Sequence, residues 1–144
     1  MRRGPTAERD EDMNWSYGCP ECGARLNPRK VIVLIGRKDD ADMLVGFHPE
    51  PGNYEVFLPP GVEKIRGDEW QFFCPVCRAS LQSKDNEKLC AVNLFDGEET
   101  RAVLFSRVAG EEVTFVVADR RVEQKFGEHA ENYARHLIQM KYLL

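Results

Sequence analysis

The chain has 144 residues and a formal net charge of −4, and 42% of its residues are hydrophobic while 31% are charged. These values describe an ordinary globular domain and exclude a fibrous or largely disordered chain. The acidic balance argues against a dedicated nucleic-acid binder, because phosphate contacts need clustered Lys and Arg side chains.

Residues 1 to 12 are polar and charged, and we predict that they form a disordered tail. No apolar stretch of the kind that export machinery reads is present before residue 18. The longest aliphatic run, Val31 to Ile35, is too short to cross a bilayer. We therefore expect a cytoplasmic location and no membrane association.

Residues 13 to 86 are predicted to form a β-rich region around two Cys-Pro-x-Cys motifs, which we call the first and second knuckle: Cys19 to Cys22 and Cys74 to Cys77. Between them lies a long insertion, residues 30 to 69, in which β-branched and aromatic runs alternate with Pro- and Gly-rich loops. This pattern predicts short strands at Lys30 to Ile35, Met43 to Phe47, Tyr54 to Leu58 and Glu69 to Phe73.

Residues 87 to 144 are predicted to form a three-strand antiparallel meander followed by a helix. The strands are expected at Leu89 to Phe95, Ala102 to Val108 and Val113 to Ala118, with glycine-containing turns between them. From Glu128 onward apolar residues recur at helical spacing. The whole is expected to be a β-rich α+β protein in which the two regions pack together as one body.

Both faces of the predicted meander are apolar. Val103 and Phe105 point to one side, while Leu104 points to the other. A sheet with one solvated face alternates apolar and polar residues, so both faces here need a cover. We expect the C-terminal helix to cover one face, and the cysteine-bearing region or a second copy of the chain to cover the other.

The strongest signal in the sequence is an internal repeat. The segment Trp15 to Leu26 aligns without gaps on Trp70 to Leu81, with Trp, an aromatic residue, Cys, Pro, Cys, Ala and Leu recurring at the same places. The Trp and the second aromatic residue are two positions apart and share one face of a strand, which would deliver the first cysteine of each pair. Proline then restricts the turn.

Two such pairs, Cys19 with Cys22 and Cys74 with Cys77, are predicted to bind one tetrahedral zinc ion with Zn–S distances of about 2.3 Å. Iron is the alternative metal at the same four thiolates. A pair of redox dithiols is the rival interpretation, but that chemistry needs a low-pKa thiol at a helix N-terminus, and both motifs follow predicted strands. Four cysteine ligands close the site, which is typical of structural zinc.

In its paired Cys-Pro-x-Cys motifs the chain resembles the zinc-ribbon and rubredoxin-like class. Members of that class often carry glycine after the second cysteine of the pair. Gly23 matches this pattern, whereas Arg78 stands at the equivalent place in the second knuckle, so its turn is expected to be satisfied differently. The insertion between Cys22 and Cys74 is also much longer than in a minimal ribbon.

The remaining candidates have ordinary explanations. Cys90 lies in an apolar run and is expected to be a buried small side chain, not a nucleophile. His48 is expected in a solvated loop, and His129 and His136 on an exposed helical stripe. Two small basic clusters are partly cancelled by acidic neighbours; they comprise Arg25, Arg29 and Lys30, and Arg120, Arg121 and Lys125.

No phosphate-binding loop, nucleophile elbow or metalloprotease motif is found in the sequence. We therefore expect a non-enzymatic zinc-binding protein that acts as a protein-interaction or regulatory module, with a protein partner or self-association. One alternative is a zinc ribbon that associates with nucleic acid or the ribosome. A second alternative is an iron electron carrier of the rubredoxin type.

Overall fold

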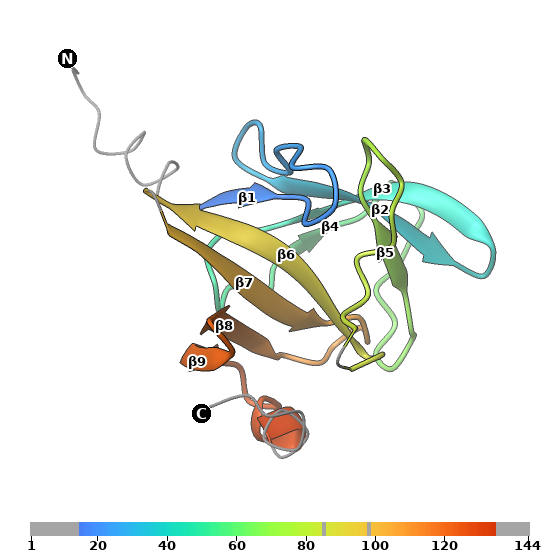
Figure 1. Ribbon diagram of the computed structural model, residues 1–144. Coiled ribbons are helices and arrows are strands. Elements are labelled where there is room, and N and C mark those ends of the chain that lie inside the picture. The colour runs from blue at the N-terminus through green and yellow to red at the C-terminus, as the bar shows by residue number, and fades with distance from the viewer. Residues whose placement is uncertain (1–14, 85, 98, 135–144) are drawn as a thin grey trace, which may run out of the picture.

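The computed structural model describes residues 15–134 apart from residues 85 and 98. The described chain forms two antiparallel sheets and a helical segment at its C-terminal end (Figure 1). The predicted tail, residues 1 to 12, lies outside the described residues.

The first sheet has five strands in the order β1-β6-β7-β8-β9. Its strands are β1 (Ser16–Gly18), β6 (Leu89–Asp96), β7 (Glu99–Ser106), β8 (Thr114–Ala118) and β9 (Arg121–Phe126). β1 comes from the N-terminal part of the chain and pairs with β6, with Tyr17 opposite Leu94. The predicted boundary between residues 86 and 87 therefore does not separate the two sheets.

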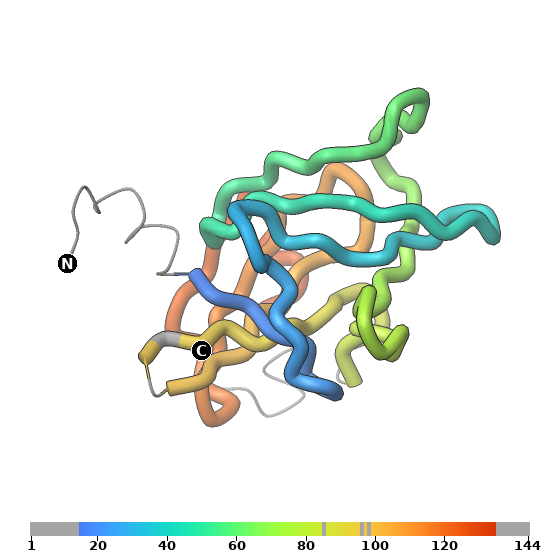
Figure 2. The backbone as a smooth tube through the Cα atoms, turned by 90° about the horizontal axis from the view of Figure 1, so that it is seen from above, coloured from blue at the N-terminus to red at the C-terminus, as the bar shows by residue number. Residues whose placement is uncertain are grey.

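The second sheet has four strands in the order β4-β3-β2-β5. Its strands are β2 (Ile32–Lys38), β3 (Ala41–Phe47), β4 (Val56–Phe57) and β5 (Gln71–Phe73). All of them fall within or beside the predicted insertion, which is thus a sheet in its own right. Figure 2 looks down on this sheet, with the other sheet behind it.

The meander is longer than predicted, because β9 adds a fourth strand to β6, β7 and β8. The segment Arg121–Phe126 is mostly polar and exposed, so it carries no clear buried alternation from which a strand could be predicted. Charged side chains suit its place at the edge of the sheet, where they hinder pairing with another chain. The turn before it, Asp119 and Arg120, has φ values of 52° and 61°, as a two-residue hairpin turn requires.

The two apolar faces of the meander are both covered, as expected. Val92, Val103 and Val116 join a core that lies between the two sheets. Leu104 and Phe115 point the other way, into a second core that includes Ala130 and Tyr133 from the C-terminal segment. One face is therefore buried by the cysteine-bearing region and the other by the helical segment.

That helix begins at Glu131, slightly later than the predicted Glu128, and is described as far as Ala134. Ala130, Tyr133 and Ala134 are buried, in agreement with the predicted apolar stripe. His136 and the later positions of the stripe lie outside the described residues. Within the described ranges, no helix is long and apolar enough to span a membrane.

Candidate metal centre

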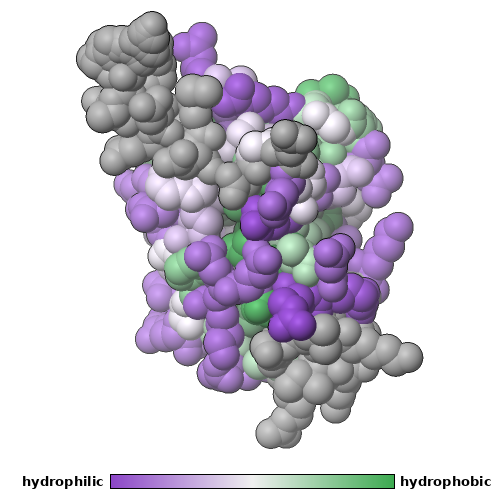
Figure 3. Space-filling view, turned by 60° about the vertical axis from the view of Figure 1, so that its left-hand side comes forward, coloured by the Kyte–Doolittle hydropathy of each residue, from purple (hydrophilic) through white to green (hydrophobic). Residues whose placement is uncertain are grey.

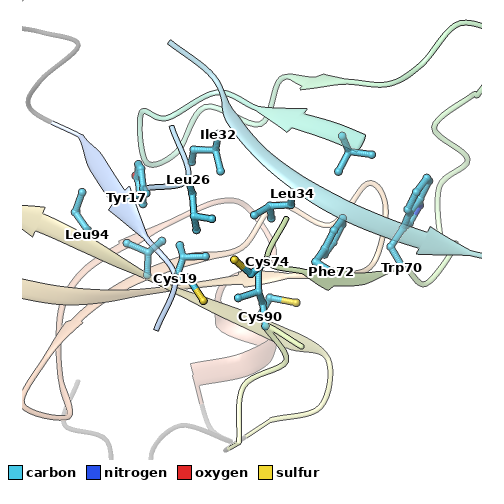
Figure 4. Close-up of a cluster of buried hydrophobic side chains, with 14 of the residues drawn as sticks. Tyr17, Cys19, Leu26, Ile32, Leu34, Trp70, Phe72, Cys74, Cys90 and Leu94 are labelled. Carbon is cyan, nitrogen blue, oxygen red and sulfur yellow. The ribbon is translucent and has the colours of Figure 1, made fainter. Parts of the chain in front are cut away.

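The four motif cysteines come from two different sheets. Cys19 follows directly after β1 of the five-stranded sheet, and Cys74 follows directly after β5 of the four-stranded sheet. The sequence prediction that a strand delivers each first cysteine is confirmed. Figure 4 shows the side chains of Cys19 and Cys74 close together in the space between the sheets.

Each knuckle is also the place where the chain passes from one sheet to the other. After the first knuckle the chain enters β2. After the second knuckle, the N–H of Ser83 donates to the carbonyl of Leu89, and the N–H of Ala91 donates to the carbonyl of Leu81, which joins this segment to β6. The metal centre therefore lies where the two crossings meet.

The internal repeat of the sequence is a repeat of backbone geometry. The N–H of Cys19 donates to the carbonyl of Ala24 at 2.9 Å, and the N–H of Cys74 donates to that of Ala79 at 3.0 Å. The N–H groups of Leu26 and Leu81 close the two turns in the same way, each by a 2.9 Å bond to the carbonyl of the preceding aromatic residue, Tyr17 or Phe72.

The second knuckle makes the same turn as the first, so the expectation that Arg78 satisfies its turn differently is wrong. Gly23 has a φ of 77° and Arg78 a φ of 64°. The N–H of Gly23 donates to the carbonyl of Cys19, and that of Arg78 donates to the carbonyl of Cys74, both at 2.9 Å. Arg78 therefore occupies the left-handed region, which is unfavourable for a residue with a Cβ atom.

The four sulfur atoms all lie within 4.8 Å of one another. The Sγ atoms of Cys19 and Cys77 are 3.8 Å apart, and so are those of Cys22 and Cys74. A tetrahedral ion with metal–sulfur bonds of about 2.3 Å needs sulfur–sulfur edges of about 3.8 Å. A disulfide would need about 2.05 Å. The predicted ligand set thus comes together at the spacing of a four-cysteine metal site.

Backbone N–H groups point at the sulfurs from within each knuckle. Cys19 Sγ accepts from the N–H groups of Glu21 and Cys22 at 3.3 and 3.4 Å. Cys74 Sγ accepts from those of Val76 and Cys77 at 3.3 and 3.5 Å. These donors favour the thiolate form that metal coordination requires.

The thiols differ in burial and in acidity. Cys19 and Cys74 are buried, whereas Cys22 and Cys77 are exposed. Burial opposes the ionisation of Cys74, but the N–H groups of Cys77 and Val76 and the neighbouring sulfurs outweigh it and lower its pKa to about 7. The Ala79 N–H favours the Cys77 thiolate, yet burial and the three neighbouring sulfurs raise its pKa to about 12.

No family model, curated protein or solved structure matches this chain. The metal centre therefore rests on the geometry of its own residues.

The other sequence candidates lie apart from this site. Cys90 is fully buried in the core between the sheets, as expected, and burial raises its pKa to about 12. His48 Nδ1 accepts from the N–H of Glu50, and His129 Nδ1 accepts from that of Glu112, so each imidazole has a structural role in a loop. Of the first basic cluster, Arg25 donates to the carbonyl of Asn27.

One feature was missed at the sequence level. The outer face of the four-stranded sheet, turned away from the five-stranded sheet, is apolar. It carries Val31, Val33, Ile35, Leu44, Phe57 and Phe73. A signal was present, because the unbroken apolar run Val31 to Ile35 lacks the alternation of a half-solvated strand.

Proposed function

We propose that the four cysteines bind a structural zinc ion and that the protein is a non-enzymatic interaction module. The closed set of four thiolates, two from each sheet, is the observation that carries this proposal. A catalytic zinc site keeps an open position for water or substrate, whereas four protein thiolates fill the coordination sphere. The ion then fixes the two sheets relative to each other, and the protein surface provides the function.

The sulfur geometry alone suits zinc and iron equally. Elemental analysis and the colour of the purified protein distinguish the two metals. Protein purified without metal-binding tags is expected to contain one zinc per chain by elemental analysis and to be colourless. A red protein with visible absorption that bleaches on reduction would instead support the iron electron carrier.

The outer face of the four-stranded sheet is the surface that we assign to the partner. Leu44 is 60% exposed and lies opposite Ile35, which in turn lies opposite Phe73 on β5. Phe57 is 44% exposed and lies opposite Gly46, in the next row of the same face. No other described segment covers this face, which Figure 2 shows from above.

Charged groups border this apolar face at one end. Arg37 lies over the ring of Phe73, with its guanidinium carbon 4.6 Å from the ring centre, and pairs with Asp42 on β3. The side of the molecule seen in Figure 3 is mainly hydrophilic, with hydrophobic residues in separate patches. An apolar centre with a polar rim is the usual arrangement of a protein-binding surface. We therefore expect a partner that presents a complementary apolar surface.

The test places a photo-reactive side chain at Phe57 and compares two charge substitutions. Leu44→Asp is expected to reduce partner crosslinking at least tenfold. Ile65→Asp should leave partner crosslinking unchanged, because Ile65 is similarly exposed (53%) but lies in the loop between β4 and β5, outside the strands that form this face.

Three results would count against a protein partner. Crosslinks to nucleic acid that disappear at moderate salt would favour the nucleic-acid alternative. Crosslinks only between copies of this chain, with a dimer by light scattering, would assign the face to self-association. An equal loss of crosslinking in Leu44→Asp and Ile65→Asp would show that the outer face of the four-stranded sheet is not the binding surface.

A further inference from the structure

A cavity of about 160 Å³ lies between the two sheets, apart from the metal centre. Leu34 and Val45 line it from the four-stranded sheet, and Val92 and Val103 line it from the five-stranded sheet. None of the four metal-site cysteines contributes to its wall. Its volume is about that of an engineered apolar cavity that remains dry and binds benzene.

Aromatic rings form much of one wall. Phe47 meets Phe72 edge to face at 5.3 Å between ring centres, and Phe105 lies 5.9 Å from Phe47 and 6.0 Å from Phe72. Trp70 stacks on Phe72 with an interplanar angle of 3°. Figure 4 shows Phe72 and Trp70 side by side, with Leu34 next to Phe72. Such a wall offers edges and faces to a flat ring.

The hydroxyl groups in the wall already have partners within the chain. The Tyr17 hydroxyl donates to the carbonyl of Pro49 at 2.6 Å, and the hydroxyls of Tyr54 and Thr114 are hydrogen-bonded at 2.9 Å. The Ser106 hydroxyl donates to the Glu111 carboxylate at 2.6 Å. An internal water needs two to four polar partners. The described wall therefore favours an apolar occupant over water.

The side of the cavity that opens to solvent carries charged residues. Glu50, Glu55 and Lys64 contribute to the wall and are exposed, so they lie at its rim. Two of these three charges are negative, which disfavours an anionic ligand. A cation would leave water for a largely apolar interior, and of the two half-buried carboxylates in the wall, Glu111 and Glu112, that of Glu111 is already hydrogen-bonded to Ser106 and Tyr133. An uncharged ligand avoids both costs.

We propose that this cavity is a binding site for a small, uncharged, flat ring compound, of a size between benzene and indole. The proposal is independent of the function proposed above, because neither the metal nor the outer face of the four-stranded sheet takes part. The loop between β3 and β4 forms part of the rim, and the hydroxyls of Tyr17 and Tyr54 tie this loop to the five-stranded sheet.

The test uses the metal-loaded full chain with three probes of similar shape: toluene, benzoate and benzylammonium. Toluene at about ten times its dissociation constant is expected to raise the melting temperature by about 4 °C. It should also give nuclear Overhauser effects to the methyl groups of Val103 and Leu34. Benzoate and the ammonium probe should do neither.

Two substitutions by a larger residue locate the binding. Val103→Leu narrows the cavity and is expected to weaken toluene binding at least tenfold. Val117→Leu is the matched control, because Val117 is equally buried (5% exposed for both) but belongs to the core beneath the helical segment. Val45→Leu narrows the cavity from the opposite sheet and replaces Val103→Leu if that variant does not fold.

The proposal fails if toluene gives no shift and no Overhauser effects to these methyl groups. It also fails if the effects reach only the exposed Leu44, or if either charged probe binds as well as toluene. An equal loss of toluene binding in Val103→Leu and Val117→Leu would also show that the cavity is not the binding site.

Discussion

At the scale of single residues, Arg78 shows that the second knuckle is held in an unfavourable backbone conformation. Its φ of 64° matches the φ of 77° at Gly23, but only glycine adopts this region without cost. The repeat in the sequence predicted that the two knuckles share one backbone turn. The arginine at the position of the glycine suggested that their turns differ. The matching hydrogen bonds around both cysteine pairs show that the two knuckles make the same turn.

We predict that Arg78→Gly stabilises the metal-loaded protein by about 0.5 to 1 kcal/mol, because it relieves this conformation. The mirror substitution, Gly23→Ala, should destabilise it by about 1 kcal/mol. A Cβ at Gly23 would meet no other atom within 4 Å, so its effect is conformational rather than steric. Urea unfolding of both variants measures the two changes. A loss of stability in Arg78→Gly would show that the arginine charge stabilises the thiolates instead.

Cys90 lies apart from the four cysteines of the candidate metal centre and is fully buried in the core between the sheets. Burial raises its pKa to about 12, so at pH 8 only about one molecule in ten thousand carries the thiolate. We expect iodoacetamide to leave Cys90 unmodified in the folded protein between pH 7 and 9, and to modify it readily in urea. Peptide mapping by mass spectrometry measures this. Modification of Cys90 ahead of the exposed Cys22 in the folded protein would contradict the prediction.

At the scale of elements, the strands with buried β-branched or aromatic runs could be predicted from the sequence, and those without could not. The predicted Lys30 to Ile35 and Leu89 to Phe95 correspond to β2 and β6, with shifted ends. β9 was missed because most of its side chains are polar and exposed. The pairing of β1 with β6 also could not be predicted from the sequence, since a strand of only three residues carries no signal of a partner so far along the chain.

β1 depends on a close approach that only glycine permits. A Cβ at Gly18 would lie 2.5 Å from Cε2 of Phe95 on β6, the next strand. We predict that Gly18→Ala costs about 1 to 2 kcal/mol of unfolding free energy, because the Phe95 ring must move. In a Phe95→Ala background the same substitution should cost much less. Thermal unfolding of the four proteins of this cycle measures the coupling, and equal costs in both backgrounds would show that the ring is not the obstacle.

At the scale of the whole molecule, the four cysteines of the candidate metal centre lie between two sheets that otherwise meet through the core between them. The sequence predicted that these four cysteines come together, because the repeated motif fixes residue type and spacing together. The cavity and the apolar outer face could not be predicted in the same way, since both depend on which strands from distant parts of the chain lie opposite one another.

Removal of the ion should therefore loosen the whole molecule. We expect a strong chelator to lower the melting temperature by about 10 °C or more.

Cys19→Ser and Cys74→Ser should each abolish metal binding, although the two residues belong to different sheets. Cys90→Ala is the control that should keep one metal ion per chain. Metal content and thermal unfolding are measured for all three variants. If Cys19→Ser or Cys74→Ser keeps the full metal content, the two pairs do not share an ion.

The crossing of the chain between the sheets at each knuckle also fixes an order of events during synthesis. The first knuckle emerges from the ribosome long before the second, and its strand β1 must wait for β6, which emerges later still. Contacts between such distant segments are slow to form. With the proposed metal site, an early ion can engage only the two thiolates of the first knuckle, and full coordination has to wait until the second knuckle has emerged. Free metal concentration in the cell is therefore expected to govern how fast newly made chains mature, as well as how stable the finished ones are.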